Sequence, residues 1–146
     1  MELIAEVFGV FAVQNVLGMS PVVVLRSEDG RILPIYIGIS EAMAIYSALK
    51  GQTPPRPMTH DLLVEVFTRL SARVEKIVID DLVENTFYAR LIVKQDGHEL
   101  EIDARPSDSI AVAVRLACPI FVEDKVLDEA GNEELPDNYI EFDQIV

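Results

Sequence analysis

Two short polar segments contain the residue types that are most able to do chemistry in this chain. One runs from Arg56 to Asp61 (Arg-Pro-Met-Thr-His-Asp) and the other from Asp103 to Asp108 (Asp-Ala-Arg-Pro-Ser-Asp). Each combines an arginine, a proline, a hydroxyl residue and a carboxylate, and each lies where a helix is expected to begin. Free backbone N–H groups and the positive end of the helix dipole are concentrated at such a place, so it can hold an anionic ligand. We expect the two segments to form one site if the protein has a chemical function.

In the first segment, the functional interpretation gives His60 the role of a general base or ligand. Asp61 would then bind a metal ion, and Arg56 would hold a phosphate or carboxylate group. The structural alternative needs no ligand, because Asp61 would complement the helix dipole and Thr59 would cap the helix.

In the second segment, Asp103 and Asp108 are candidate ligands for Mg²⁺ or Mn²⁺, which prefer oxygen donors. Glu41 is a candidate third carboxylate, because an internal repeat places it on Asp108. Arg105 would stabilise phosphate oxygens. The alternative is that Arg105 only pairs with one of these aspartates.

Hydroxyl residues at the expected helix starts complete the candidate site. Besides Thr59, they are Ser40 and Ser107, which we expect to be helix N-caps. If the helix starts bind anions, these three hydroxyl groups are the expected contacts.

The repeat relates residues 4–50 to residues 71–117 at a constant offset. Identical pairs in its best-matching part are Leu33 and Leu100, Ile35 and Ile102, Ser40 and Ser107, Ala44 and Ala111, and Leu49 and Leu116. Each copy has the pattern of three strands and a helix. A duplication and a chance similarity between two such units both remain open.

The elements that position the candidate residues follow from this pattern. We expect strands over 4–13, 22–26, 33–37, 75–82, 86–94 and 99–103, and helices from Ser40 to near Gly51, over 59–70 and over 108–117. The fold class is therefore α+β: duplicated β3α units forming a mixed, mainly antiparallel sheet with packed helices in a single domain. That domain would span 1–128. Residues 129–146 would be an acidic C-terminal tail, loose except for short ordered pieces around Tyr139 to Phe142.

Composition limits the function further. The chain has 146 residues, half of them hydrophobic, with one cysteine and a net charge of −13. One cysteine allows no internal disulfide, and no apolar run is long enough to span a membrane, so we expect a cytoplasmic protein without membrane contact. The negative charge argues against tight nonspecific binding of nucleic acid, but it allows a small local basic site. The helix over 108–117 is apolar nearly all round, which suggests a subunit contact in a homo-oligomer.

Several segments together resemble one known family. They are Leu33-Pro-Ile-Tyr-Ile-Gly38, the segment 55–63, Asn85-Thr-Phe-Tyr-Ala89, the segment 103–110 and Pro119-Ile-Phe-Val122. This set resembles the bifunctional nuclease domain family, also called the domain of unknown function 151 family, over roughly residues 3 to 128. The chain has Tyr36 where the family pattern often has Trp. The resemblance implies hydrolysis of RNA and DNA, but it provides no agreed set of catalytic residues.

Two hypotheses of function follow. The first is a nuclease that hydrolyses phosphodiester bonds of RNA and DNA with Mg²⁺ or Mn²⁺. The second is a non-catalytic oligomeric module that binds a small anion or a protein partner. It rests on the negative charge, on the structural roles available to the helix-start residues and on the apolar helix.

Overall fold

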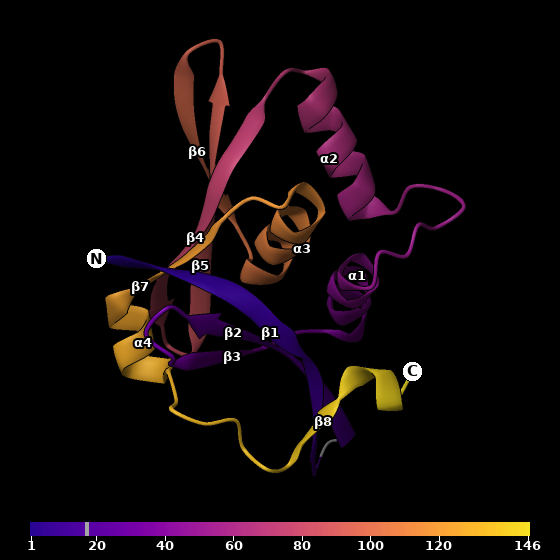
Figure 1. The fold of residues 1–146 in the computed structure, drawn as a ribbon, viewed down its shortest axis with the longest axis vertical. Helices are drawn as coiled ribbons and strands as arrows, with labels where there is room; N and C mark the ends of the chain where they lie inside the picture. Colours follow the sequence, from indigo (N-terminus) through magenta and orange to yellow (C-terminus); the bar gives the residue numbers. More distant parts are fainter. Residues whose placement is uncertain (17) are drawn as a thin grey trace.

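A single mixed sheet is the frame of this protein, and it confirms the α+β fold class (Figure 1). The structure is a computed structural model that describes residues 1–16 and 18–146. The strands are β1 (Glu2–Asn15), β2 (Gly18–Ser27), β3 (Ile32–Tyr36), β4 (Arg73–Val83), β5 (Thr86–Gln95), β6 (His98–Ala104), β7 (Ile120–Glu123) and β8 (Tyr139–Glu141). The helices are α1 (Ile39–Leu49), α2 (Thr59–Arg69), α3 (Pro106–Leu116), α4 (Asp124–Ala130) and a 3₁₀ turn, η1 (Phe142–Gln144).

The order of strands across the sheet is β3-β2-β1-β7-β4-β5-β6, and β8 pairs with β1. β7 joins the two halves: it is antiparallel to β1 and parallel to β4. The other pairings are antiparallel, as the sequence predicts. The strands β1 to β3 run across the view in Figure 1 while β4 and β5 stand upright, so the sheet is strongly twisted.

Both halves contain three consecutive strands followed by a helix, as the repeat predicts. The repeat offset also aligns the observed N-caps of the two helices, Gly38 and Arg105. Common descent of the two halves remains a prediction.

The expected N-caps Ser40, Thr59 and Ser107 are wrong, because all three lie inside the first turn of their helices. In α3 the reason is Pro106, whose ring fixes φ near the helical value and so starts the helix there.

Side chains from both faces of the sheet are buried. The main core lies between the sheet and the helices α1 and α3, and it includes Leu25, Leu33, Ile45, Ile79 and Ile110. A second, smaller cluster lies on the other face of the first half: Phe11, Val13, Val22, Val24 and Ile32, with Leu135 and Tyr139 packed against it. The continuous apolar run Val22-Val23-Val24-Leu25 is therefore buried on alternate sides, like a strand that is covered on both faces.

The acidic tail is more ordered than the sequence analysis expects. Its predicted ordered piece is present, since β8 pairs with β1 and continues into η1. Phe142 is fully buried in the main core, and its ring lies 5.4 Å from that of Tyr46 in α1. The tail thus closes one end of the core and does not hang free. Within the described residues, no helix is both long and apolar enough to cross a membrane.

The burial of Phe142 leads to a prediction about stability. Phe142→Ala should lower the free energy of unfolding by about 3–5 kcal/mol, because it removes a large side chain from a closed core. The control Val146→Ala, at a side chain that is 60% exposed, should change it by less than about 0.5 kcal/mol. Chemical denaturation measures both. An equal, small effect of the two variants would mean that the tail does not pack on the core.

Candidate functional site

The two polar segments meet where the first turn of α2 lies against α3. The Nε2 atom of His60 lies 2.8 Å from Oδ1 of Asp108, in the first turn of α3. The Nε atom of Arg115, in the last turn of α3, donates to Oδ1 of Asp61 at 2.8 Å. Neighbouring residues of α2 therefore contact opposite ends of α3. The C-terminal ends of the two segments, distant in the sequence, therefore lie in contact in the fold.

A hydrogen bond to Asp108 fixes the orientation of the His60 imidazole ring. Its side chain is only 13% exposed, and Asp108 binds Nε2. No hydrogen bond joins Nδ1 to a described residue, and no buried side-chain nitrogen or oxygen among the described residues lacks a partner. Nδ1 must therefore reach solvent. A histidine with one ring nitrogen on a carboxylate and the other open to solvent is arranged like a general base oriented by a third group.

Asp108 also binds Arg105, the N-cap of α3. The Nε atom of Arg105 donates to Oδ2 at 2.9 Å and Nη2 donates to Oδ1 at 3.2 Å. Burial raises the pKa of Asp108, but the hydrogen bonds from Arg105 and His60 outweigh it and hold this pKa below the ordinary value. Asp108 is therefore ionised at neutral pH and can stabilise a protonated His60.

Asp61 has a structural role that the sequence suggests only in part. Its Oδ2 accepts a hydrogen bond from the backbone N–H of Met58 at 2.9 Å, which closes the start of α2. The hydrogen bond from Arg115, followed by that from Met58, lowers the pKa of Asp61. Arg115 is 11% exposed and was not predicted as a site residue. A single arginine in a helix that is otherwise apolar was the available signal, since a buried cation needs a partner.

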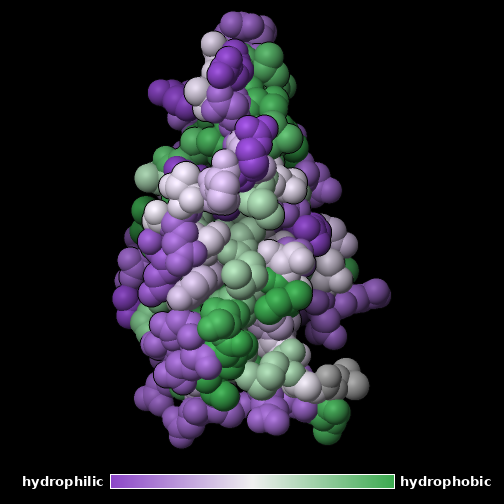
Figure 2. Space-filling view, turned by 90° about the vertical axis from the view of Figure 1, so that its right-hand side faces the viewer, coloured by the Kyte–Doolittle hydropathy of each residue, from purple (hydrophilic) through white to green (hydrophobic). Residues whose placement is uncertain are grey.

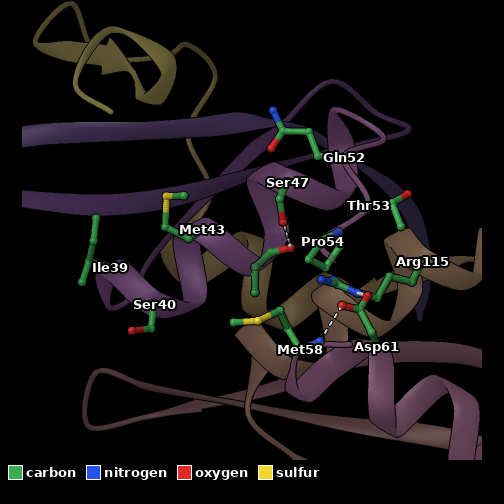
Figure 3. Close-up of a pocket in the computed structure, with 11 residues that line it drawn as sticks. Ile39, Ser40, Met43, Ser47, Gln52, Thr53, Pro54, Met58, Asp61 and Arg115 are labelled. Carbon is green, nitrogen blue, oxygen red and sulfur yellow. Dashed lines mark hydrogen bonds and ion pairs between the residues drawn. The ribbon is translucent and has the colours of Figure 1, made fainter. Parts of the chain in front are cut away.

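Beside the pair of Asp61 and Arg115 lies a largely apolar pocket of about 540 Å³ (Figure 3). Its wall is formed by α1, the loop that precedes α2, and these two side chains. Ile39, Met43 and Met58 line it and are exposed. Ser40 also lines this pocket, so it faces a different hollow from Ser107.

Arg56 lies on the proline-rich loop before α2 and is exposed. The chain has twelve lysines and arginines, and ten of them lie within 4.0 Å of a carboxylate. In the part of the chain that the structure describes, Arg56 and Lys50 have no such partner. Arg56 is thus the unpaired cation next to His60 in the sequence, as a phosphate-binding role requires.

Glu41 lies in the first turn of α1 and lines a hollow of about 490 Å³ together with Arg105 and Ser107. Its charge contributes, after that of Asp108, to the raised pKa of Arg105. Glu41 therefore interacts electrostatically with Arg105, which in turn binds Asp108. Thr59 is exposed in the first turn of α2.

Asp103 is not brought to this group. It pairs in register with Arg90 of β5, and the neighbouring residues of β5, Ala89 and Leu91, point into the main core. Because residues alternate between the faces of a strand and directly paired residues share a face, Asp103 lies on the side of the sheet away from α3. There it lines another hollow with Asp80 and Asp81.

The carboxylates do not assemble a ready metal centre in this chain. No group of three or more His, Cys, Asp and Glu side chains suited to a metal occurs among residues 1–16 and 18–146. Both oxygens of Asp61 and both of Asp108 already accept hydrogen bonds. The residues present therefore do not fit a Mg²⁺ or Mn²⁺ ion without rearrangement, and metal dependence remains a prediction.

Comparison with known proteins identifies the family of the chain. The sequence model of the bifunctional nuclease domain matches residues 23–134, a range that includes both polar segments and Arg115. The chain belongs to the bifunctional nuclease domain family. The resemblance seen in the sequence is thereby confirmed.

Relatives of the chain include an uncharacterized protein and several proteins named bifunctional nucleases. An uncharacterized protein of Mycobacterium tuberculosis is 47% identical over 112 residues, which is 76% of this chain and 66% of the relative. Bifunctional nuclease 1 of Oryza sativa subsp. japonica is 29% identical over 131 residues, 84% of this chain and 40% of the relative. Bifunctional nuclease 1 of Arabidopsis thaliana is 29% identical over 107 residues, 70% of this chain and 33% of the relative. The chain thus spans less than two thirds of the length of these relatives.

The contact of Asp61 with Arg115 predicts a pH-dependent contribution to stability. Asp61→Asn should lower the free energy of unfolding at pH 7 by about 1.5–3 kcal/mol, the usual range for hydrogen bonds to charged groups. Because the pKa of Asp61 is lowered in the folded protein, this contribution is complete above the unfolded value of about 3.8 and is lost as the pH falls through the lower, folded value. Denaturation of both proteins from pH 7 down to about pH 2 should therefore show converging stabilities.

The matched control is Glu65→Gln in the same helix. Glu65 pairs with Arg69 on an exposed surface, so its loss should cost only about 0.3–0.5 kcal/mol. A constant difference between Asp61→Asn and the wild type at all pH values would contradict the assigned role of the Asp61 carboxylate.

Proposed function

We propose that this protein is a nuclease that hydrolyses phosphodiester bonds in RNA and DNA at the group formed by His60, Asp108, Arg105 and Arg56. The observation that carries the proposal is the 2.8 Å contact between His60 and Asp108, made across two helices in a chain of the bifunctional nuclease domain family. Relatives named bifunctional nucleases support the reaction class.

His60 would act as the general base. A water molecule attacks phosphorus and its proton passes to Nδ1 of His60. The bond from phosphorus to the leaving sugar oxygen breaks, and this oxygen leaves with the bonding electron pair and takes up a proton from solvent. Water is the nucleophile that serves both substrates, because DNA has no 2′-hydroxyl group. The ionised Asp108 fixes the tautomer of the imidazole and stabilises the imidazolium that forms.

The arginines would hold the phosphate. Arg105 uses Nε and Nη2 on Asp108, which leaves Nη1 without a partner among the described residues. Arg56 has no ion pair at all in that part of the chain and is exposed. Two guanidinium groups aimed at one phosphate stabilise the negative charge that grows in the transition state.

Metal dependence is a separate part of the proposal. Mg²⁺ or Mn²⁺ could bind only if Asp61 or Asp108 exchanged a hydrogen bond for the ion, or if the phosphate of the substrate supplied further oxygen ligands. The hydrolysis assay should therefore be run with each ion and with a chelator. Full activity in the presence of the chelator would refute metal dependence, and the mechanism based on His60 would still stand.

The histidine leads to a direct test. His60→Gln should lower the rate of hydrolysis of labelled single-stranded RNA and DNA by about 10²–10⁴-fold, the usual contribution of general acid–base catalysis. Glutamine keeps a donor for Asp108 but cannot accept the proton at neutral pH, so the fold should persist. Initial rates of cleavage and a thermal unfolding curve measure the two effects.

The matched control is His98→Gln, because His98 is the other histidine of the chain and lies exposed at the start of β6. It should leave the rate unchanged. Equal residual activity of His60→Gln and wild-type preparations would point to a contaminating nuclease and refute the proposal.

A second candidate function, an oligomeric module that binds a partner, is favoured by one observation. Hydrophobic side chains gather on the face that carries α1 and α2 (Figure 2). The exposed hydrophobic side chains of α1 and α2 include Ile39, Met43, Leu62 and Val66, and Met58 directly precedes α2. Exposed apolar patches of this kind often mark sites of protein–protein contact.

Light scattering over a range of concentrations tests this candidate. If the face joins two copies of the chain, the wild type should have at least the mass of a dimer. Met43→Glu, which places a charge in the face, should give a monomer. A wild type that is monomeric at every concentration would remove the subunit contact.

A further inference from the structure

A second hollow lies next to the proposed catalytic group and is not used by it. Its volume is about 490 Å³, within the range of small-molecule pockets. Four segments form its wall: residues 20–21 of β2, the end of β3 with the start of α1 (35–38 and 41), the tip of the β4–β5 hairpin (85–87) and the start of α3 (105–107). The segments from β3, from the β4–β5 hairpin and from α3 coincide with three of those that carry the family resemblance.

The hollow is coupled to His60 through two side chains. Arg105 lines the hollow and binds Asp108, and the same Oδ1 atom of Asp108 contacts His60. A molecule in the hollow that touches Arg105 would therefore be separated from the general base by the side chains of Arg105 and Asp108. This places the hollow where the part of a substrate next to the scissile phosphate would lie.

The chemistry of the wall suits an unpaired nucleobase better than a phosphate. The only charged residues among those that line it are Arg105 and Glu41, which have opposite signs. A phosphate would meet Glu41 as a like charge, whereas the N–H groups of a base would meet it as an acceptor. Asn85, in a left-handed conformation at the hairpin tip, adds an amide that both donates and accepts.

The wall also offers an aromatic surface. Tyr36 lines the hollow and is 60% exposed, although a tyrosine normally buries most of its ring. Tyr139 of the tail lies close to it, because Tyr36 contributes, after burial, to the raised pKa of Tyr139. Exposed aromatic rings are the surfaces on which proteins stack single-stranded bases.

We infer that this hollow is a subsite for one unpaired base of a single-stranded nucleic acid, stacked on Tyr36 and hydrogen-bonded by Glu41 and Asn85. The inference rests on the proposed nuclease function, since that function supplies the substrate class. It adds that the substrate must be single-stranded at this position, because a paired base cannot enter.

Binding of two short labelled strands tests the subsite. One is an ordinary single-stranded DNA oligonucleotide, and the other has the same phosphates but abasic residues in place of nucleotides. Fluorescence anisotropy is measured in the His60→Gln background, so that the strand stays intact. Tyr36→Ala should weaken binding of the ordinary strand by about 5- to 150-fold, the range for the loss of one stacked base. It should change binding of the abasic strand by less than about twofold.

Two controls separate stacking from other effects. Tyr36→Phe keeps the ring and loses only the hydroxyl group, so it should bind the ordinary strand within about twofold of the parent. Tyr88→Ala removes another exposed tyrosine, which lines the hollow on the opposite side of the sheet, and should have no effect.

The outcomes are distinct from those for catalysis. An unchanged affinity of Tyr36→Ala for the ordinary strand, an equal loss for both strands, or no binding of either strand would overturn the subsite. A base-dependent loss in a protein without hydrolytic activity would overturn the nuclease mechanism and keep the subsite.

Discussion

The candidate site depends on how α2 is attached to α3. α2 has no fully buried residue, so hydrophobic burial alone holds it weakly. α3, in contrast, is buried over most of its length, from Pro106 to Ala113. The contacts of His60 with Asp108 and of Asp61 with Arg115 attach the start of the exposed helix to the two ends of the buried one. The same contacts that hold α2 therefore set the position of the histidine.

The charge distribution explains how an acidic protein can have a local site for an anion. The net charge is −13, yet nearly all cations are used in pairs with carboxylates that stabilise the fold. Arg31, for example, joins the β2–β3 hairpin to Asp124 and Asp128 of α4. The cations left for a ligand are few, and one of them, Arg56, precedes His60 by four residues in the sequence. A nucleic acid is then repelled at long range, and contacts made at short range must provide the affinity.

Much of the fold and part of the site follow from sequence. Hydrophobic periodicity gives the strands and helices because each has one buried face, and the two polar segments do meet. Asp103 shows the limit: alternation places it on the polar face of β6, but it does not show that the helices cover the other face. Arg115 was missed because its partner, Asp61, lies far away in the sequence. The packing of the tail was missed as well, although the unbroken apolar run in β2 requires a cover on both faces.

The central position of β1 has a consequence for the way the chain folds. Its neighbours on one side are β7 and β8, and the pairing of Glu2 with Glu123 joins positions at nearly opposite ends of the sequence. Closing so long a loop lowers the entropy of the chain before the stabilising contacts have formed. The local meander β4–β5–β6 can form earlier, because its turns are short. We therefore infer that the two halves fold separately. The four-residue strand β7 would then pair with β1 and β4 late in folding and join the two halves.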